Sequence, residues 1–211
     1  MAKSERELML GGKLYSCNDP ELLRAREKAE DLCFAFNHTL PSDPKRREIL
    51  AKLAPNIHPN AFLRGPFYCD YGTYIEMGEG CYANWNLTVL DVCPVKLGKN
   101  VFMGPNVTLC TAEHPLVAKE RMCFLDPKIG VTDLEYGKPI SIGDGVWLGE
   151  GVTVLGGVHI GENSVIGAGS LVTHDIPANT LAYGVPAKAI RKITEKDELR
   201  FHPELFDLER K

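Results

Sequence analysis

At 211 residues, the chain is long enough for one principal domain with an appendage, and its net charge of −4 argues against a general nucleic-acid binder. No stretch approaches the roughly 20 apolar residues needed to span a bilayer, and the charged N-terminus does not resemble a signal peptide. The seven cysteines include no Cys-x-x-Cys pair, which is typical of a reduced cytoplasmic protein with buried thiols. We therefore expect neither a membrane nor a nucleic-acid partner.

Residues 1–55 are predicted to form a helical segment. Asp19 before Pro20 suits an N-cap followed by proline at the first helical position. The triplet Ser42-Asp43-Pro44 indicates a second helix that begins in the same way, and Pro55 ends it.

Residues 56–190 are predicted to form a β-helix, because from residue 77 onward the sequence repeats every six residues. Aliphatic residues recur without a slip at 142, 148, 154, 160, 166 and 172, and a small or β-branched residue follows each of them four places later. This period fits neither a helix nor a flat strand, but it fits a parallel β-solenoid in which each hexapeptide is one short strand and a corner. Aliphatic residues point inward, and Gly or Asn takes the corner, where φ can be positive.

The repeat is interrupted by a loop over residues 113–138. Register is lost after Thr111 and resumes at Ile142, and long loops in compact domains are usually functional. The loop begins with Glu113-His114-Pro115. Because aliphatic side chains fill the solenoid, a ligand must bind outside it, against this loop or another subunit, and we expect a homo-oligomer. In the tail, residues 191–211, a capping box at 194–197 predicts a short closing helix.

Five motifs in order resemble the maltose/galactoside O-acetyltransferases, which are acetyl-CoA-dependent enzymes of the hexapeptide-repeat superfamily. The motifs are Tyr82-Ala83-Asn84-Trp85-Asn86, Leu90-Asp91-Val92-Cys93-Pro94, Thr111-Ala112-Glu113-His114-Pro115, Leu134-Glu135-Tyr136-Gly137-Lys138-Pro139 and Gly184-Val185-Pro186-Ala187-Lys188. The resemblance covers nearly the whole chain, and the second and fourth motifs are closer to the maltose-type branch. It implies a left-handed β-helix, a homotrimer, a sugar acceptor, acetyl-CoA as co-substrate and no required metal.

His114 is the candidate catalytic residue. A sugar hydroxyl is a weak acid, so a neutral imidazole must accept its proton as the oxygen attacks the thioester. His114 lies where the predicted solenoid meets the loop, and it matches the family's catalytic histidine. The alternative is a hydrogen-bonded structural histidine.

The resemblance also implies a set of acceptor-binding residues: Asn84, Asp70, Tyr82, Arg26 and Glu135. Their alternatives are a corner-forming asparagine, a solvated turn residue, a packed aromatic, a surface ion pair and an exposed loop carboxylate. The sequence departs from the galactoside-type pattern at Val92 and Cys17, where that subtype has acidic acceptor ligands. We therefore expect a glucose- or maltose-like acceptor.

A second set of residues is expected to bind coenzyme A, whose phosphates need cationic or backbone N–H donors. Lys188 and Arg191 follow the Gly-Val-Pro turn, and a solvated basic tail is the alternative for Arg191. His174 stands where the family has a lysine. The remaining positions matched by the resemblance are Glu150, Ala168 and Thr173.

Three other functions fit parts of the sequence. A hexapeptide acyltransferase could act on a non-sugar or oligosaccharide acceptor. A zinc hydratase on the same fold would need three converging histidines, yet His114 has no histidine within ten residues. A non-catalytic solenoid would need neither a histidine at the loop nor a basic last coil.

Overall fold

The computed structural model describes residues 3–206, so residues 1–2 and 207–211 of the predicted terminal segments lie outside the described residues. The N-terminal segment holds α1 (Glu5–Leu10), β1 (Tyr15–Ser16), α2 (Pro20–His38) and α3 (Lys45–Leu53). Asp19 caps α2 as predicted, accepting a 2.9 Å hydrogen bond from the Glu21 backbone N–H. The second predicted helix is α3, which begins at Lys45, and Asp43 accepts a hydrogen bond from the Lys45 N–H at 2.9 Å.

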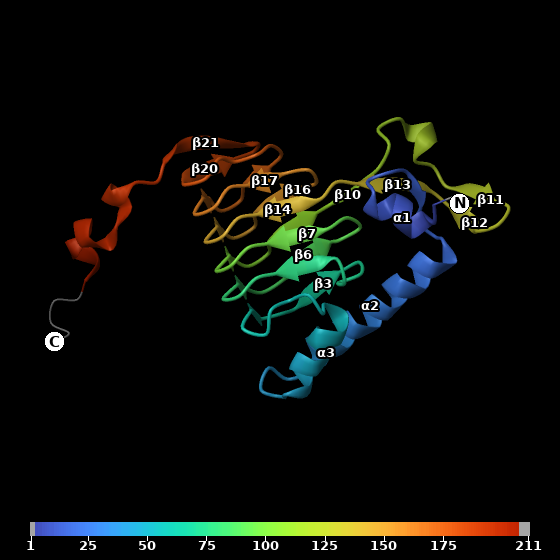
Figure 1. Ribbon diagram of the computed structural model, residues 1–211, viewed down its shortest axis with the longest axis horizontal. Coiled ribbons are helices and arrows are strands. Elements are labelled where there is room, and N and C mark those ends of the chain that lie inside the picture. The colour runs from blue at the N-terminus through green and yellow to red at the C-terminus, as the bar shows by residue number, and fades with distance from the viewer. Residues whose placement is uncertain (1–2, 207–211) are drawn as a thin grey trace.

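The predicted parallel β-solenoid is confirmed, and its strands stack as the column in Figure 1. The first face contains β4 (Ile75–Met77), β7 (Val95–Leu97), β14 (Ile140–Ile142) and β17 (His159–Ile160). The second contains β2 (Phe62–Leu63), β5 (Tyr82–Ala83), β8 (Phe102–Met103), β15 (Trp147–Leu148), β18 (Val165–Ile166), β20 (Thr180–Gly184) and β21 (Ala187–Lys192). The third contains β3 (Phe67–Cys69), β6 (Leu87–Leu90), β9 (Thr108–Cys110), β16 (Thr153–Leu155) and β19 (Leu171–Val172).

The six-residue repeat accounts for this architecture. The aliphatic residues of the uninterrupted run lie inside the column with exposures between 0% and 3%. Corners use residues that tolerate the left-handed region, where most side chains clash with the backbone. Asparagines take it with φ between 54° and 62° at five positions: Asn86, Asn100, Asn106, Asn163 and Asn179.

The predicted loop is present between β9 and β14, and it is partly ordered into strands. It contains β10 (Ala112–Glu113), the 3-10 turn η1 (Ala118–Glu120), β11 (Phe124–Asp126), β12 (Gly130–Thr132) and β13 (Leu134–Gly137). β13 pairs antiparallel with β10 on one side and with β1 on the other. The N-terminal segment is thereby attached to the loop, on the side of the column that carries α1 in Figure 1.

The C-terminal end departs from the parallel pattern. β21 folds back antiparallel onto β20, and three 3-10 turns follow: η2 (Glu195–Asp197), η3 (Leu199–Phe201) and η4 (Pro203–Leu205). The Thr194 capping box is formed, but it begins a 3-10 turn, so the expected closing helix is a series of short turns. Among the described residues, no helix is long and apolar enough to cross a membrane.

Candidate active site

The candidate site lies at one corner of the prism. We call the passage from the third face to the first the loop corner; it comprises residues 70–74, 91–94, 111–139, 156–158 and 173–175. The passage from the second face to the third is called the second corner, with residues 64–66, 84–86, 104–107, 149–152 and 167–170. His114 follows β10 at the loop corner, as the sequence predicts.

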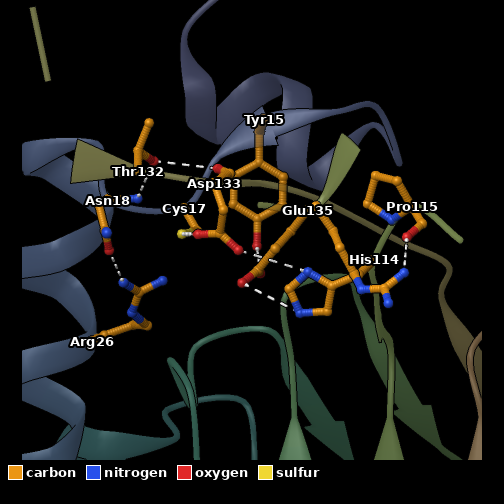
Figure 2. Close-up of polar contacts among 10 residues, drawn as sticks. Tyr15, Cys17, Asn18, Arg26, His114, Pro115, Thr132, Asp133 and Glu135 are labelled. Carbon is orange, nitrogen blue, oxygen red and sulfur yellow. Dashed lines mark hydrogen bonds and ion pairs between the residues drawn. The ribbon is translucent and has the colours of Figure 1, made fainter. Parts of the chain in front are cut away.

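The His114 ring lies between two carboxylates, as Figure 2 shows. Its Nδ1 is 3.7 Å from Asp133 Oδ2, and its Nε2 is 3.9 Å from Glu135 Oε1. The His114 side chain is 48% exposed, while the two carboxylates are 18% and 17% exposed. The imidazole is therefore accessible to a ligand, and each of its nitrogens faces an acceptor of its N–H.

β1 holds the two carboxylates in place. Tyr15 lies opposite Glu135 in the strand pairing and donates a 2.7 Å hydrogen bond to Glu135 Oε2. The Cys17 thiol donates a 2.6 Å hydrogen bond to Asp133 Oδ1. Burial, reinforced by the Asp133 hydrogen bond, raises the pKa of Cys17 to about 11, and burial beside Glu135 raises the pKa of Tyr15 as well. Both groups therefore stay protonated donors at neutral pH.

Two further predicted acceptor residues belong to the same cluster. Arg26 on α2 donates a 3.1 Å hydrogen bond to Asn18 Oδ1, next to Cys17. Asp70 is half-buried at the loop corner, and its pKa is raised to about 7, mainly by burial and then by the charges of Asp91 and Glu135. Arg26 partly offsets this shift. The charges of Arg26 and Asp70 thus both act on Glu135, and Glu135 in turn faces His114.

The other two predicted acceptor residues, Tyr82 and Asn84, lie away from the loop corner in the fold. Tyr82 is on the second face, its ring centroid 5.9 Å from that of Phe62 and 6.1 Å from that of Phe102. Asn84 is at the second corner, where its Oδ1 accepts a 2.9 Å hydrogen bond from the Trp85 N–H. Within one chain, the third face of the prism separates both residues from the loop corner.

The predicted coenzyme A residues occupy both corners and the last strand. Glu150 and Ala168 lie at the second corner, whereas Thr173 and His174 lie at the loop corner, joined by a 2.8 Å hydrogen bond between Thr173 Oγ1 and His174 Nδ1. Lys188 and Arg191 are on β21. The Arg191 guanidinium binds both oxygens of Asp197, at 2.7 and 2.8 Å, so a phosphate would have to compete with this pair.

Sequence reasoning missed Asp133 and Tyr15, and it considered Cys17 only as a departure from a pattern. The available signal was the spacing of Asp133 and Glu135, which places both on one face of an extended strand. Cys17, Asp133 and Glu135 also bring donor atoms within 4.8 Å of one another, a set that could hold a metal ion. No histidine belongs to this set in the part of the chain that the structure describes, so the set is not the three-histidine site of a zinc hydratase.

The fold and the exposed histidine define a hexapeptide-repeat transferase, and comparisons with known proteins agree. Residues 139–174 match the bacterial transferase hexapeptide model, and residues 8–53 match the maltose acetyltransferase hexapeptide capping motif. The galactoside O-acetyltransferase of Escherichia coli is 42% identical over 193 residues, which cover 91% of either chain. The chain therefore belongs to the maltose/galactoside O-acetyltransferase family, and it is an acetyltransferase.

Two solved structures share the whole architecture. A maltose O-acetyltransferase from Clostridium difficile is 43% identical with a TM-score of 0.84, and the match covers 92% of this chain and all of that one. A galactoside acetyltransferase in complex with coenzyme A is 40% identical, also with a TM-score of 0.84, over 93% of this chain and 94% of that one. The shared fold extends from the helical segment through the solenoid.

Proposed function

We propose that this protein transfers the acetyl group of acetyl-CoA to a hydroxyl of a small sugar of the glucose or maltose type. The observation that carries the proposal is the half-exposed His114 ring between two carboxylates at the start of the loop. The two structural relatives, one a maltose O-acetyltransferase and the other holding coenzyme A, support the acceptor class and the donor.

In the proposed reaction, His114 is the general base. One ring nitrogen accepts the hydroxyl proton while the sugar oxygen attacks the thioester carbonyl carbon. The carbon–sulfur bond then breaks, and the proton passes from the imidazolium to the departing thiolate. The imidazolium formed on the way has a carboxylate within 4 Å of each nitrogen, which stabilises its positive charge.

The acceptor sugar would be held by the polar groups around the ring. Glu135 Oε1 and the Asp70 carboxyl can accept hydrogen bonds from sugar hydroxyls, and the Arg26 guanidinium can donate to sugar oxygens. Asn84 and Tyr82 would join them from a neighbouring subunit, since one prism holds them away from its own loop corner.

We infer a homotrimer for the same reason. Acceptor and coenzyme A residues are divided between two corners of one prism, so a complete site requires the second corner of one subunit to face the loop corner of the next. Lys188 and Arg191 would bind the phosphates of coenzyme A, with Glu150, Ala168, Thr173 and His174 along its arm. Because the described cysteines are all free thiols, we expect the enzyme in the cytoplasm.

The test is release of free thiol from acetyl-CoA in the presence of a panel of sugars. We expect turnover with glucose or maltose that His114→Ala abolishes. Turnover only with an oligosaccharide or an amine would favour the alternative acyltransferase function, and the absence of thiol release with every acceptor would contradict the proposal.

A further inference from the structure

β1 and β13 present a matched set of donors and carboxylates. Cys17 and Asp133 continue the pairing just beyond the two strands, through a 3.3 Å hydrogen bond from the Cys17 N–H to the Asp133 backbone oxygen. Tyr15 and Cys17 are two residues apart, as are Asp133 and Glu135, so all four side chains point to the same face. His114 lies on that face, as Figure 2 shows. Each carboxylate has one oxygen bound to a donor from the β1 segment and the other turned toward the imidazole.

The two carboxylates are not equivalent. A neutral imidazole carries only one N–H, so it can donate to one carboxylate at a time. Asp133 is the shorter side chain, and its backbone oxygen also accepts hydrogen bonds from the Cys17 N–H at 3.3 Å and the Thr132 hydroxyl at 3.2 Å. Its Oδ2 is the closer of the two facing oxygens, 3.7 Å from Nδ1. Asp133 is therefore the better fixed acceptor.

We propose that Asp133 is a positioning residue, which accepts the Nδ1–H of His114 and so leaves the lone pair on Nε2 to remove the acceptor proton. The proposal deepens the proposed function, because it rests on His114 as general base. Glu135 Oε1, 3.9 Å from Nε2, then lies beside the reacting hydroxyl, where it can bind the acceptor and stabilise the imidazolium.

The Cys17 thiol would determine which way an asparagine amide at position 133 is oriented, and this orientation can be tested. The thiol donates to Asp133 Oδ1, so an asparagine at position 133 would turn its carbonyl oxygen toward the thiol and its NH₂ toward His114. Nδ1 would then have to accept a hydrogen bond, and the proton would move to Nε2. Asp133→Asn should therefore hold His114 in the unreactive tautomer with almost no change in shape.

The tautomer can be read directly from the long-range nitrogen–proton spectrum of the histidine rings at about pH 8.5, above the ordinary titration range of histidine. The His114 signals are assigned by their loss in His114→Ala. We expect an Nδ1–H tautomer in the wild type and an Nε2–H tautomer in Asp133→Asn. The kcat of Asp133→Asn should fall about 100-fold or more while the KM for acetyl-CoA stays within twofold.

The double variant Cys17→Ala/Asp133→Asn separates this mechanism from a merely structural effect. Without the thiol, the asparagine amide is free to turn its oxygen toward Nδ1, so part of the Nδ1–H tautomer and of the kcat should return. Cys17→Ser/Asp133→Asn, which keeps a donor at position 17, should recover neither the Nδ1–H tautomer nor the kcat. Glu120→Gln, an exposed carboxylate change in the same loop, is the matched control and should alter neither readout.

Three outcomes would overturn the proposal: an Nε2–H tautomer in the wild type, a kcat for folded Asp133→Asn within threefold of wild type, or a double variant no better than the single one. Should Asp133→Asn fail to fold, the wild-type tautomer still decides, because an Nε2–H tautomer contradicts the proposal. Because the spectrum needs no acceptor, failure of this proposal is distinguishable from failure of the sugar assignment.

Discussion

Tyr15 and Glu135 lie opposite each other in the pairing of β1 with β13, and the Tyr15 hydroxyl donates a 2.7 Å hydrogen bond to the Glu135 carboxylate. Tyr15 is 1% exposed, so this bond is formed where water does not compete for the hydroxyl. The position of a loop carboxylate beside His114 therefore depends on a residue from the N-terminal segment.

Tyr15→Phe should weaken acceptor binding. The change keeps the ring in the apolar cluster but leaves Glu135 Oε2 without its donor, which costs about 1–3 kcal/mol for a charged acceptor. We expect the acceptor KM to rise about tenfold, with the KM for acetyl-CoA unchanged. Steady-state kinetics with each substrate varied in turn measure both values, and an equal rise in the two would contradict the assignment.

His114→Ala should lower kcat by about 10²–10⁴-fold, the usual contribution of a general base, with little change in acetyl-CoA affinity. His202, a half-buried histidine in the C-terminal turns, provides the control, and His202→Ala should leave kcat as it is. A His114→Ala enzyme that keeps a third of the wild-type turnover would remove His114 from the mechanism.

The chain should sediment as a trimer. Each prism divides the predicted site between two corners, and the second face exposes aromatic side chains that a neighbouring subunit can cover, among them Phe62, Phe102 and Trp147 at 56%, 52% and 55% exposure. Sedimentation equilibrium at micromolar concentration should give three times the chain mass of 23.3 kDa. A monomer under these conditions would leave each site incomplete and contradict the shared-site arrangement.

Glucose or maltose should be a better acceptor than a thiogalactoside. Val92 is 3% exposed in the apolar cluster with Tyr15 and Cys17, so it offers no polar contact. Asp133 places a carboxylate next to Cys17, whereas the Val92 side chain offers none. One lost hydrogen bond lowers the kcat/KM for an acceptor by about tenfold. The kcat/KM values for glucose, maltose and a thiogalactoside test this order. A preference for the thiogalactoside would contradict the interpretation that Val92 removes a contact to the acceptor.

Asp70→Asn should stabilise the protein above neutral pH. The folded-state pKa of about 7 is higher than the ordinary aspartate value near 3.9, so the fold favours the protonated carboxyl. Wild-type stability is therefore lost progressively as pH rises from about 4 to about 7, and the neutral amide escapes this loss. We expect the gain in Tm to be small at pH 4.5 and largest at pH 8. A gain independent of pH would show that Asp70 is not the titrating group.

The solenoid could be predicted because each of its coils is determined by local requirements that recur every six residues. An aliphatic residue such as Ile160 must be buried, and a corner such as that at Asn163 needs a residue that tolerates positive φ. Handedness has no such local signature, and in the sequence it was implied only by the family resemblance.

Much of the site could not be predicted, because it depends on a contact between distant segments. β1 has only two residues, too few for any periodicity, and its partner β13 lies in a loop whose register with the solenoid is lost. His114 and Glu135 lie in the family motifs, and the resemblance implies Arg26 and Asp70 from positions outside those motifs. Asp133 belongs to none of those motifs, and only the β1 pairing shows that its carboxylate faces the histidine.

The pairing of Tyr15 with Glu135 also sets an order of events during synthesis. The two residues are 120 positions apart, so a ribosome adding 5–20 residues per second needs roughly 6–24 s to deliver the second after the first. Throughout that interval, β1 has no strand to pair with, while the first coils of the solenoid can already stack on one another. The cluster of Tyr15, Glu135 and His114 is thus completed only when the loop has left the ribosome. A chain arrested before residue 135 would carry folded coils and an unpaired N-terminal strand.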